Sequence, residues 1–502
     1  MAASPTTGSE GSTLHDGAGN VAPSHAKPQE QQQQQNESEF LSLWDPSLKS
    51  QRKEFLKQWA IGFGLATFFM WLVLPIYWGS YYRQQFKLDS LKVALVDLDS
   101  RGANANNVNA VLGPVLLQAP QNLPNPNNLG FVQVDNSRFA VSGGQSGLDV
   151  HEWARYAVHN ADYFGVIIAN ANATSAAINA YQTVINGGTV QYDATGALSM
   201  YYEEGRNFET VDQWVAPRMN SFVNNQVLPT AATDFMSLIA NRISSVSAAT
   251  FSNIDATALA NVVSTPFAPA IFNVRPIQHF AGIPATSVGL IYVLIFTYFI
   301  SMQWNSARAG LESKLRLIDL AVLRVVVPVA IYVFISLWIS LVTLAFRVDF
   351  TQSYGKGGFP LFWLSNFMTM WALGMPMEVA LSFLGPKYTA FFLLWWVVWN
   401  VSDIADMAIF YRYGFGFPVY QAVENGKAII FGTKSRFGLR FGVLTAWIVC
   451  GTAALVLTTM YKRHSAKKQK QQQQEEKERE ERQREKRESR PENGEKRPIW
   501  LQ

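Results

Sequence analysis

Six long apolar segments constrain this chain more than any other feature. The first, Trp59–Trp78, contains no charged residue. About 20 helical residues at roughly 1.5 Å each span about 30 Å, which is the thickness of one hydrocarbon core. The others are Ile283–Met302, Val322–Phe346, Phe359–Leu384, Tyr388–Ile409 and Phe441–Tyr461. Because only 16% of the residues are charged, we expect a polytopic α-helical membrane protein with six transmembrane helices.

Positive side chains beside these segments predict the orientation of the chain. Lysines and arginines cluster before the first segment, between the second and third, and after the sixth. Such clusters mark the cytoplasmic side, and six crossings place all three of them there, together with both termini. A fourth group, from Arg412 to Arg440, argues against this orientation, because it lies between segments five and six on the proposed outer side.

The region between the first two segments, residues 83–280, predicts a folded extracytoplasmic domain. A structureless insertion of about 200 residues is improbable. The apolar runs "VALVDL" and "YFGVIIA" predict strands, as does "GGTVQYD" after its turn, whereas "HEWARYAVHNA", "ATSAAINAYQ" and "NFETVDQWVAPRMNSFVNN" predict helices. This alternation is typical of a mixed α/β fold. Its core forms without a disulfide, because the single cysteine, Cys450, lies in the sixth segment.

The two ends of the chain predict solvated cytoplasmic tails. Residues 1–40 are rich in Gly, Ser and Gln and nearly free of large apolar side chains, so they predict disorder. Residues 462–502 mix acidic and basic side chains densely, which predicts a solvated charged tail that could form a helix; the alternative is that its cations bind anionic lipid of the inner leaflet. Between the tails we expect a juxtamembrane segment with the first helix at 41–82, the α/β domain at 83–280 and a membrane domain at 281–461.

The stretch "LKVALVDLDS" ends in an acidic pair, Asp97 and Asp99. Alternate residues of a strand lie on one face, so the two carboxylates could chelate a divalent ion in a membrane enzyme. A buried strand with a polar end is the simpler interpretation. The chain contains no GxxxxGK[ST] loop, which excludes P-loop nucleotide binding, and the sequence assigns no resident metal. In the same domain, Asn172-Ala173-Thr174 matches a glycan acceptor.

Charged residues inside the apolar segments indicate where a transport pathway would run. Placing a charge in the bilayer interior costs on the order of 3 kcal/mol, so such side chains usually face a cavity or a partner. The candidates are Arg324, Glu378, Asp403 and Asp406. The alternatives are that Arg324 extends to the membrane surface and that the two aspartates lie at the outer interface.

Three stretches of the chain resemble a known family. "LKVALVDLDS", "MYYEEGRNF" and above all "FYRYGFGFPVYQAVENGKAIIFGT" are similar to the fungal nitrosoguanidine-resistance protein family, which is related to bacterial phage-infection proteins and to the membrane domains of type-2 ABC exporters. The resemblance covers about residues 40–461. It implies that Pro418, Tyr420, Lys427 and Gly432 belong to a re-entrant hairpin before the last transmembrane helix, packed against protein.

The resemblance also implies a function. It points to a homodimeric, transporter-like protein of the plasma membrane that affects resistance to toxic compounds, by efflux or by altering lipid distribution. It assigns no catalytic residue and no cofactor, so we expect no enzyme activity. Active transport would need a separate ATPase subunit or an ion gradient, and membrane lipid, not nucleic acid, is the expected partner. The two alternatives are a membrane enzyme that uses the acidic pair and a non-transporting scaffold or sensor.

Overall fold

The computed structural model describes residues 44–81, 84–101, 109–123, 127–140, 147–243, 254–312, 314–401 and 414–488. The chain divides into two compact units, Met1–Phe68 and Phe69–Gln502. The described part of the first unit holds the short 3₁₀ helix η1 (Pro46–Leu48) and most of α2 (Lys49–Tyr81), which continues into the second unit. In the first unit, α2 exposes large apolar side chains, among them Trp59 and Phe63, as a lipid-facing helix does.

The second unit contains a five-stranded mixed sheet. Its strands are β1 (Lys92–Asp97), β2 (Gly130–Gln133), β3 (Gly165–Ala169), β4 (Leu198–Tyr202) and β5 (Pro269–Asn273), in the order β2-β1-β3-β4-β5. β1 pairs in parallel with β2 and β3, β4 is antiparallel to β3, and β5 is parallel to β4. The predicted mixed α/β fold of this region is therefore present, whereas the side of the membrane on which it lies stays a prediction.

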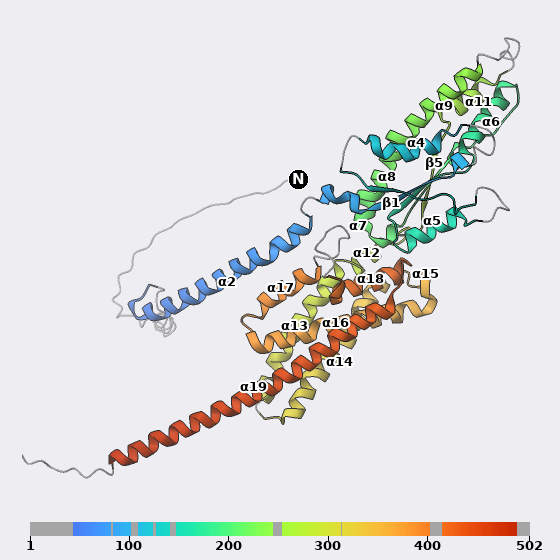
Figure 1. The fold of residues 1–502 in the computed structure, drawn as a ribbon. Helices are drawn as coiled ribbons and strands as arrows, with labels where there is room; N and C mark the ends of the chain where they lie inside the picture. The colour runs from blue at the N-terminus through green and yellow to red at the C-terminus, as the bar shows by residue number, and fades with distance from the viewer. Residues whose placement is uncertain are drawn as a thin grey trace, which may run out of the picture. The chain divides into compact units, whose positions relative to one another are not determined.

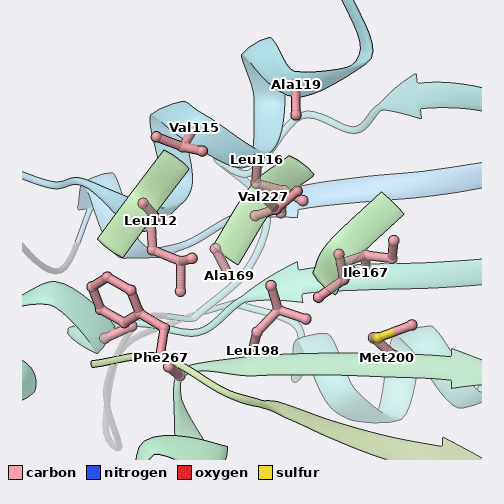
Figure 2. Close-up of a cluster of buried hydrophobic side chains, with 14 of the residues drawn as sticks. Leu112, Val115, Leu116, Ala119, Ile167, Ala169, Leu198, Met200, Val227 and Phe267 are labelled. Atoms are coloured by element: carbon pink, nitrogen blue, oxygen red, sulfur yellow. The ribbon is translucent and has the colours of Figure 1, made fainter. Parts of the chain in front are cut away.

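Side chains of successive strand residues pack on opposite faces of this sheet. Val93 and Leu95 of β1 join a large core with helices on one face, whereas Ala94 and Val96 join a smaller core that includes α5 (Val150–His159) on the other. The helices on the larger face are α4 (Leu112–Gln118), α6 (Ala173–Ile185), α8 (Ala216–Phe222), α9 (Leu228–Ile243) and α11 (Ala256–Ser264). Figure 1 shows the two layers, and Figure 2 shows leucines of α4 packed over β3 and β4.

Some of the predicted strands and helices of this domain are present, and others are not. "VALVDL" and "YFGVIIA" are the central strands β1 and β3, and the three predicted helices are present. "GGTVQYD" forms no strand, because its residues connect α6 to the short helix η4 (Ala194–Gly196) without sheet pairing. Strands β2, β4 and β5 had not been predicted.

Five described helices are long and apolar enough to cross a membrane. They are α2, α13 (Gly289–Glu312), α14 (Leu317–Ala345), α16 (Gly358–Leu384) and α19 (Phe437–Glu488). The predicted fifth segment corresponds to α17 (Thr389–Val401), which has 13 residues; residues 402–413 lie outside the described part of the chain. A polytopic membrane protein is thus supported, and the sixth crossing stays a prediction.

Two helix boundaries differ from the apolar runs. The second segment was predicted to begin at Ile283, but α12 (Gly282–Ala285) is a separate short helix and α13 begins at Gly289 and continues to Glu312. The helix that contains the last span does not end at Tyr461, because α19 continues to Glu488. The helix suggested for the C-terminal tail is therefore present through Glu488. In this extension, exposed side chains of opposite charge lie one helical turn apart, as in the Glu478–Arg482 pair.

Candidate functional site

A buried ion pair joins two membrane helices near one end of the bundle. Arg308 of α13 and Glu378 of α16 are 2% and 0% exposed, and Nη1 of Arg308 lies 2.8 Å from Oε2 of Glu378. Asn305, one turn earlier on α13, accepts a second hydrogen bond from Arg308 at 3.0 Å. Glu312, one turn later and partly exposed, lies 3.6 Å from the guanidinium. The pair is thus held from both sides by residues of α13.

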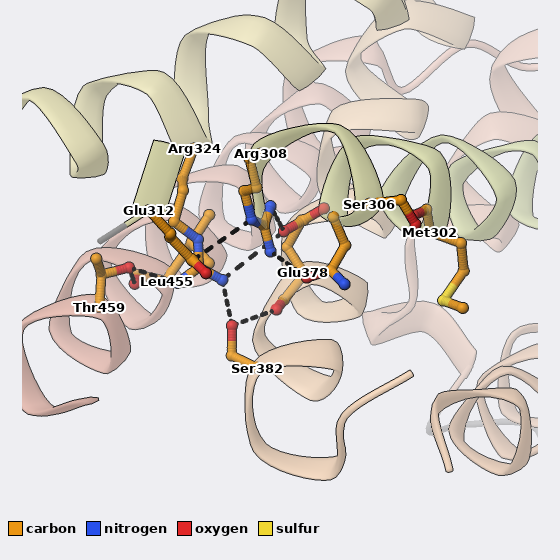
Figure 3. Close-up of polar contacts among 10 residues, drawn as sticks. Met302, Ser306, Arg308, Glu312, Arg324, Glu378, Ser382, Leu455 and Thr459 are labelled. Atoms are coloured by element: carbon orange, nitrogen blue, oxygen red, sulfur yellow. Dashed lines mark hydrogen bonds and ion pairs between the residues drawn. The ribbon is translucent and has the colours of Figure 1, made fainter. Parts of the chain in front are cut away.

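A second arginine reaches the same carboxylate from α14. Arg324 is 3% exposed, and its Nη2 lies 3.8 Å from Oε2 of Glu378. It also donates hydrogen bonds to the hydroxyl groups of Ser382 on α16 and Thr459 on α19. Arg324 therefore points into the bundle rather than toward lipid, and its depth in the membrane stays a prediction. Figure 3 shows these contacts, which we call the four-helix network: Arg308, Arg324, Glu378, Ser382 and Thr459.

The charges of the four-helix network do not balance. Two guanidinium groups share one buried carboxylate, and one oxygen of that carboxylate, Oε1 of Glu378, has no hydrogen-bond partner among the described residues. Buried charges are costly to desolvate, so a membrane protein retains them where they join helices or line a pathway. The network can do both, because it borders open volume.

A cavity of about 460 Å³ lies beside this network. Its walls include Arg308, Glu312, Arg324, Lys462 and Arg463, together with the end of α16 at Leu381 and Ser382. Four cations and one carboxylate therefore face it. A volume of this size admits a small polar or anionic group rather than a single water molecule.

The predicted re-entrant segment is a short buried helix. α18 (Pro418–Ile430) has 13 residues, roughly 20 Å at 1.5 Å per residue, too short to cross a hydrocarbon core. Most of its residues are buried, including Pro418 and Lys427, and the side-chain oxygen of Asn400 on α17 accepts the main-chain N–H of Val419 at 3.3 Å. This geometry agrees with a helix that is packed against protein on most sides.

The turn after α18 depends on a glycine. Gly432 has φ of +69°, a conformation that residues with a Cβ rarely adopt, and the chain then leads into α19. Lys427 lies 3.1 Å from Glu424, which also pairs with Arg440 at 2.8 Å. The cations that complicated the topology prediction are thus partly neutralised within this hairpin. Tyr420 lines a cavity with Glu424 and Arg440.

The acidic pair of β1 has local partners. Both oxygens of Asp97 accept hydrogen bonds from Ser100. Asp99 is fully buried and accepts from the N–H of Gly113 and from the N–H and hydroxyl of Thr174, at 3.3, 2.8 and 2.6 Å. Burial raises the pKa of Asp99, and the bonds from Thr174 and Gly113 oppose this rise. The two carboxylates therefore stabilise the edge of the sheet where β1 and β3 end.

Neither a metal site nor a glycan is placed by this geometry. Among the described residues, no group of three or more His, Cys, Asp and Glu side chains is arranged to hold a metal ion. Asn172 begins α6 in a left-handed conformation, with φ of 63°, and the hydroxyl of Thr174 in the same acceptor sequence is buried against Asp99. Glycosylation of Asn172 stays a prediction. Asp403 and Asp406 lie outside the described residues.

Sequence reasoning missed two groups of residues. The second apolar segment predicts a helix that ends near Met302, which places Arg308 in the loop that follows. In the structure α13 continues to Glu312 and carries Arg308 inside the bundle. Glu203 and His159 were given no role, yet Glu203 is 1% exposed and lies 3.2 Å from Nδ1 of His159. Their proximity depends on the sheet topology, which no local pattern reveals.

The described chain contains long apolar helices that bury an ion-pair network, and a short helix that cannot cross a hydrocarbon core. These features define a polytopic membrane protein. The chain belongs to the family described as protein of unknown function DUF3533, whose model matches residues 63–453. It is 23% identical over 451 residues to an uncharacterized endoplasmic reticulum membrane protein of Saccharomyces cerevisiae, covering 85% of this chain and 84% of that protein. No solved structure matches the chain significantly. The resemblance to nitrosoguanidine-resistance proteins and exporter domains stays a prediction.

Proposed function

We propose that this protein moves amphiphiles, either toxic compounds or lipids, across its membrane and hydrolyses no ATP itself. The observation that carries the proposal is the four-helix network beside its cavity of about 460 Å³. Four helices contribute polar side chains to one place inside the bundle, and several of these side chains face open volume. Ionisable groups in such positions usually mark substrate or ion pathways.

The alternative is that the four-helix network only holds the helices together. This alternative predicts that the polar atoms of the network are all hydrogen-bonded to one another. A purely structural ion pair is satisfied by its own partners, whereas Oε1 of Glu378 and Nε of Arg324 have no described hydrogen-bond partner. Unsatisfied buried polar atoms next to a cavity favour a site that takes up water, an ion or a headgroup. This favours transport over a static scaffold.

An apolar groove suits the other half of an amphiphile. It has a volume of about 800 Å³ and runs along α13 and α14, with Tyr292, Phe296, Trp338 and Phe346 among its walls and Asn366 of α16 at one side. An acyl chain or an apolar drug fits such walls, since few polar atoms would lose their hydrogen bonds. Membrane lipid is accordingly the partner that we propose first.

The proposal includes the sidedness and energy source expected from the sequence. The cavity of the four-helix network is bordered by Glu312 at the end of α13 and by Lys462 and Arg463 at the start of the C-terminal helix extension, so we place it at the cytoplasmic end. The α/β domain then lies on the opposite side, and an ion gradient or a separate ATPase subunit drives transport in a homodimer. The membrane itself is the plasma membrane or, as the name of the yeast relative states for that protein, the endoplasmic reticulum.

The test is a clean deletion of the gene in its own organism. We expect the deletion to raise the intracellular amount of a toxic amphiphile or to change lipid exposure on the non-cytoplasmic leaflet, and the wild-type gene to restore both. A tagged copy shows which membrane the protein occupies, so that the correct leaflet is examined. Unchanged toxin accumulation together with unchanged lipid asymmetry would refute the proposal.

A further inference from the structure

A second polar cavity lies where the α/β domain contacts the segment between α18 and α19. Its volume is about 490 Å³. Three stretches of chain that are far apart in sequence form its walls: the end of α5 at His159, the loop after β4 at Glu203 and Arg206, and the residues from Tyr420 to Arg440. We call it the junction cavity.

Hydrogen bonds fix the walls of the junction cavity. Lys434 donates to the carbonyl of Asn160 at 2.7 Å, and Arg275, just after β5, donates to the carbonyl of Gly432 at 3.0 Å. A Cβ on Gly205 would approach the side chain of Phe431 to 2.9 Å, so a glycine is needed where the β4 loop meets the hairpin. The cavity is therefore built by the fold rather than by the chance position of flexible side chains.

Most of the positive charge in this cavity is not neutralised. Four cations line it: Arg206, Lys434, Arg436 and Arg440. Within the described part of the chain, only Arg440 of these four lies within ion-pair distance of a carboxylate, that of Glu424. Arg206 is held by the carbonyl of Tyr163 and the ring of Phe164, which orient its guanidinium without cancelling its charge.

The second carboxyl group of the cavity, Glu203, does not neutralise it at neutral pH. Burial raises the pKa of Glu203 to about 8, although Arg275 and Arg206 oppose the rise. Burial also lowers the pKa of His159, as do Arg275 and Lys434. Their 3.2 Å contact is then a hydrogen bond between neutral groups rather than an ion pair. Oε1 of Glu203 is buried and has no hydrogen-bond partner among the described residues.

We propose that the junction cavity binds a phosphate-bearing anion, with Arg206, Lys434 and Arg436 supplying the positive charge. Guanidinium groups match the geometry of phosphate oxygens and bind them with paired hydrogen bonds. The volume fits a headgroup rather than a bare ion alone. This inference rests on the proposed function, because it names the ligand chemistry of the proposed transport. Binding of the ligand can nevertheless be measured without transport.

The position of the cavity along α19 favours a lipid headgroup as the source of the phosphate. Arg440 borders the junction cavity, and Lys462 borders the cavity of the four-helix network. About 22 residues of one continuous helix separate them, which is roughly 33 Å and close to the thickness of one hydrocarbon core. The two cationic cavities thus lie at the depths of the two headgroup layers of a bilayer.

The test is a binding measurement on the purified full-length protein in uncharged detergent. Short-chain phosphatidylglycerol, a phosphodiester of constant charge near neutral pH, and inorganic phosphate are titrated separately, with tryptophan fluorescence as the readout. We expect the double variant Arg206→Gln, Arg436→Gln to weaken binding about tenfold or more. Arg218→Gln and Arg155→Gln are the matched controls, because Arg218 also donates to one carbonyl and Arg155 is an exposed arginine of the same domain that does not line the cavity.

The outcomes separate the sources and the two proposals. Binding of the short-chain lipid without competition by inorganic phosphate supports a lipid headgroup, and equal binding of both supports the same site with a soluble phosphate as its source. Absence of binding to the folded protein, or equal binding by the double variant and its controls, would overturn the inference. If the wild type binds and the double variant does not, while gene deletion changes neither toxin nor lipid distribution, the transport proposal fails and this inference stands.

Discussion

The two charged cavities of this protein differ in how their cations are paired with carboxylates. In the four-helix network, two buried arginines share the carboxylate of Glu378. In the junction cavity, three of the four cations have no described carboxylate within ion-pair distance, and burial raises the pKa of the Glu203 carboxyl group to about 8. The first arrangement joins four helices from within, and breaking it is costly. The second leaves positive charge available to a ligand at little structural cost.

Removing the shared carboxylate tests the first half of this comparison and has the largest expected effect. Glu378→Gln leaves the buried Arg324 without a described carboxylate within ion-pair distance and Arg308 with only the partly exposed Glu312, so we expect a loss of about 3–5 kcal/mol in the free energy of unfolding. Thermal unfolding of the detergent-solubilised protein measures it. Glu312→Gln is the control, because this carboxylate is 40% exposed and its one ion pair among the described residues is with Arg308, and it should cost less than about 1 kcal/mol. Equal stability of Glu378→Gln and wild type would contradict the account.

The protonated carboxyl group of the junction cavity predicts a pH dependence. The folded-state pKa of Glu203, about 8, is above its unfolded value, so its contribution to stability is complete below about pH 4.5 and is lost as pH rises through 8. Glu203→Gln removes this loss, and above pH 8 the variant should be more stable than wild type by several kcal/mol.

Melting temperatures from pH 5 to 9 give this comparison directly. The groups that face Glu203 are His159, Arg206, Arg275 and Lys434. Their residue types are unchanged in the variant, but His159 contacts Glu203 directly, so the difference between the two curves reports the titration of this pair. Glu209→Gln, an exposed glutamate of the same domain, should keep the wild-type slope. A Glu203→Gln curve parallel to wild type would mean that Glu203 is ionised in the folded protein.

A third kind of carboxylate, satisfied by neutral donors, sharpens the comparison. A Cβ on Gly113 would lie 1.9 Å from Oδ1 of Asp97, which Ser100 holds in place. Gly113→Ala should therefore destabilise the α/β domain by about 1–2 kcal/mol. Gly196→Ala, where a Cβ meets nothing within 4 Å, is the control. If both variants melt together, the hydrogen bonds from Ser100 do not hold Asp97 in place.

The smallest structural effect belongs to Arg436. Its side chain is exposed and has no described carboxylate partner, so Arg436→Gln should leave the melting temperature unchanged while it weakens anion binding. Arg440→Gln is the contrasting variant, because it also breaks the pair with Glu424 and should lower stability. A loss of stability in Arg436→Gln equal to that in Arg440→Gln would remove the distinction between free and paired cations.

The sequence predicts the charges inside the apolar runs but not all of their partners. Glu378 and Arg324 are visible because a charge interrupts a hydrophobic segment. Arg308 is not visible, because the apolar run ends before it and the extent of α13 is set by packing in the bundle. The hydroxyl of Thr459 has no distinguishing pattern, since Ser and Thr often bond their own helix as well.

In the α/β domain, too, the sequence predicts some elements and not others. The central strands β1 and β3 are continuous apolar runs and were predicted, whereas β2 and β5 are partly exposed edge strands with weak patterns. The junction cavity could not be predicted, because His159, Glu203 and Lys434 come together only through the crossings of the sheet and the turn after α18. Contacts between residues this far apart leave no local signal.

The most direct test of the account is lipid movement in vesicles. Purified protein is reconstituted into phosphatidylcholine vesicles that contain a trace of headgroup-labelled phosphatidylserine, and a membrane-impermeant quencher is added with and without a proton gradient. The account predicts that label in the inner leaflet becomes accessible in proportion to the amount of wild-type protein, and more slowly with Arg206→Gln, Arg436→Gln than with Arg155→Gln. Inner-leaflet label that stays protected at every protein-to-lipid ratio, with folded protein, a proton gradient and a co-purified ATPase partner each supplied, would contradict it.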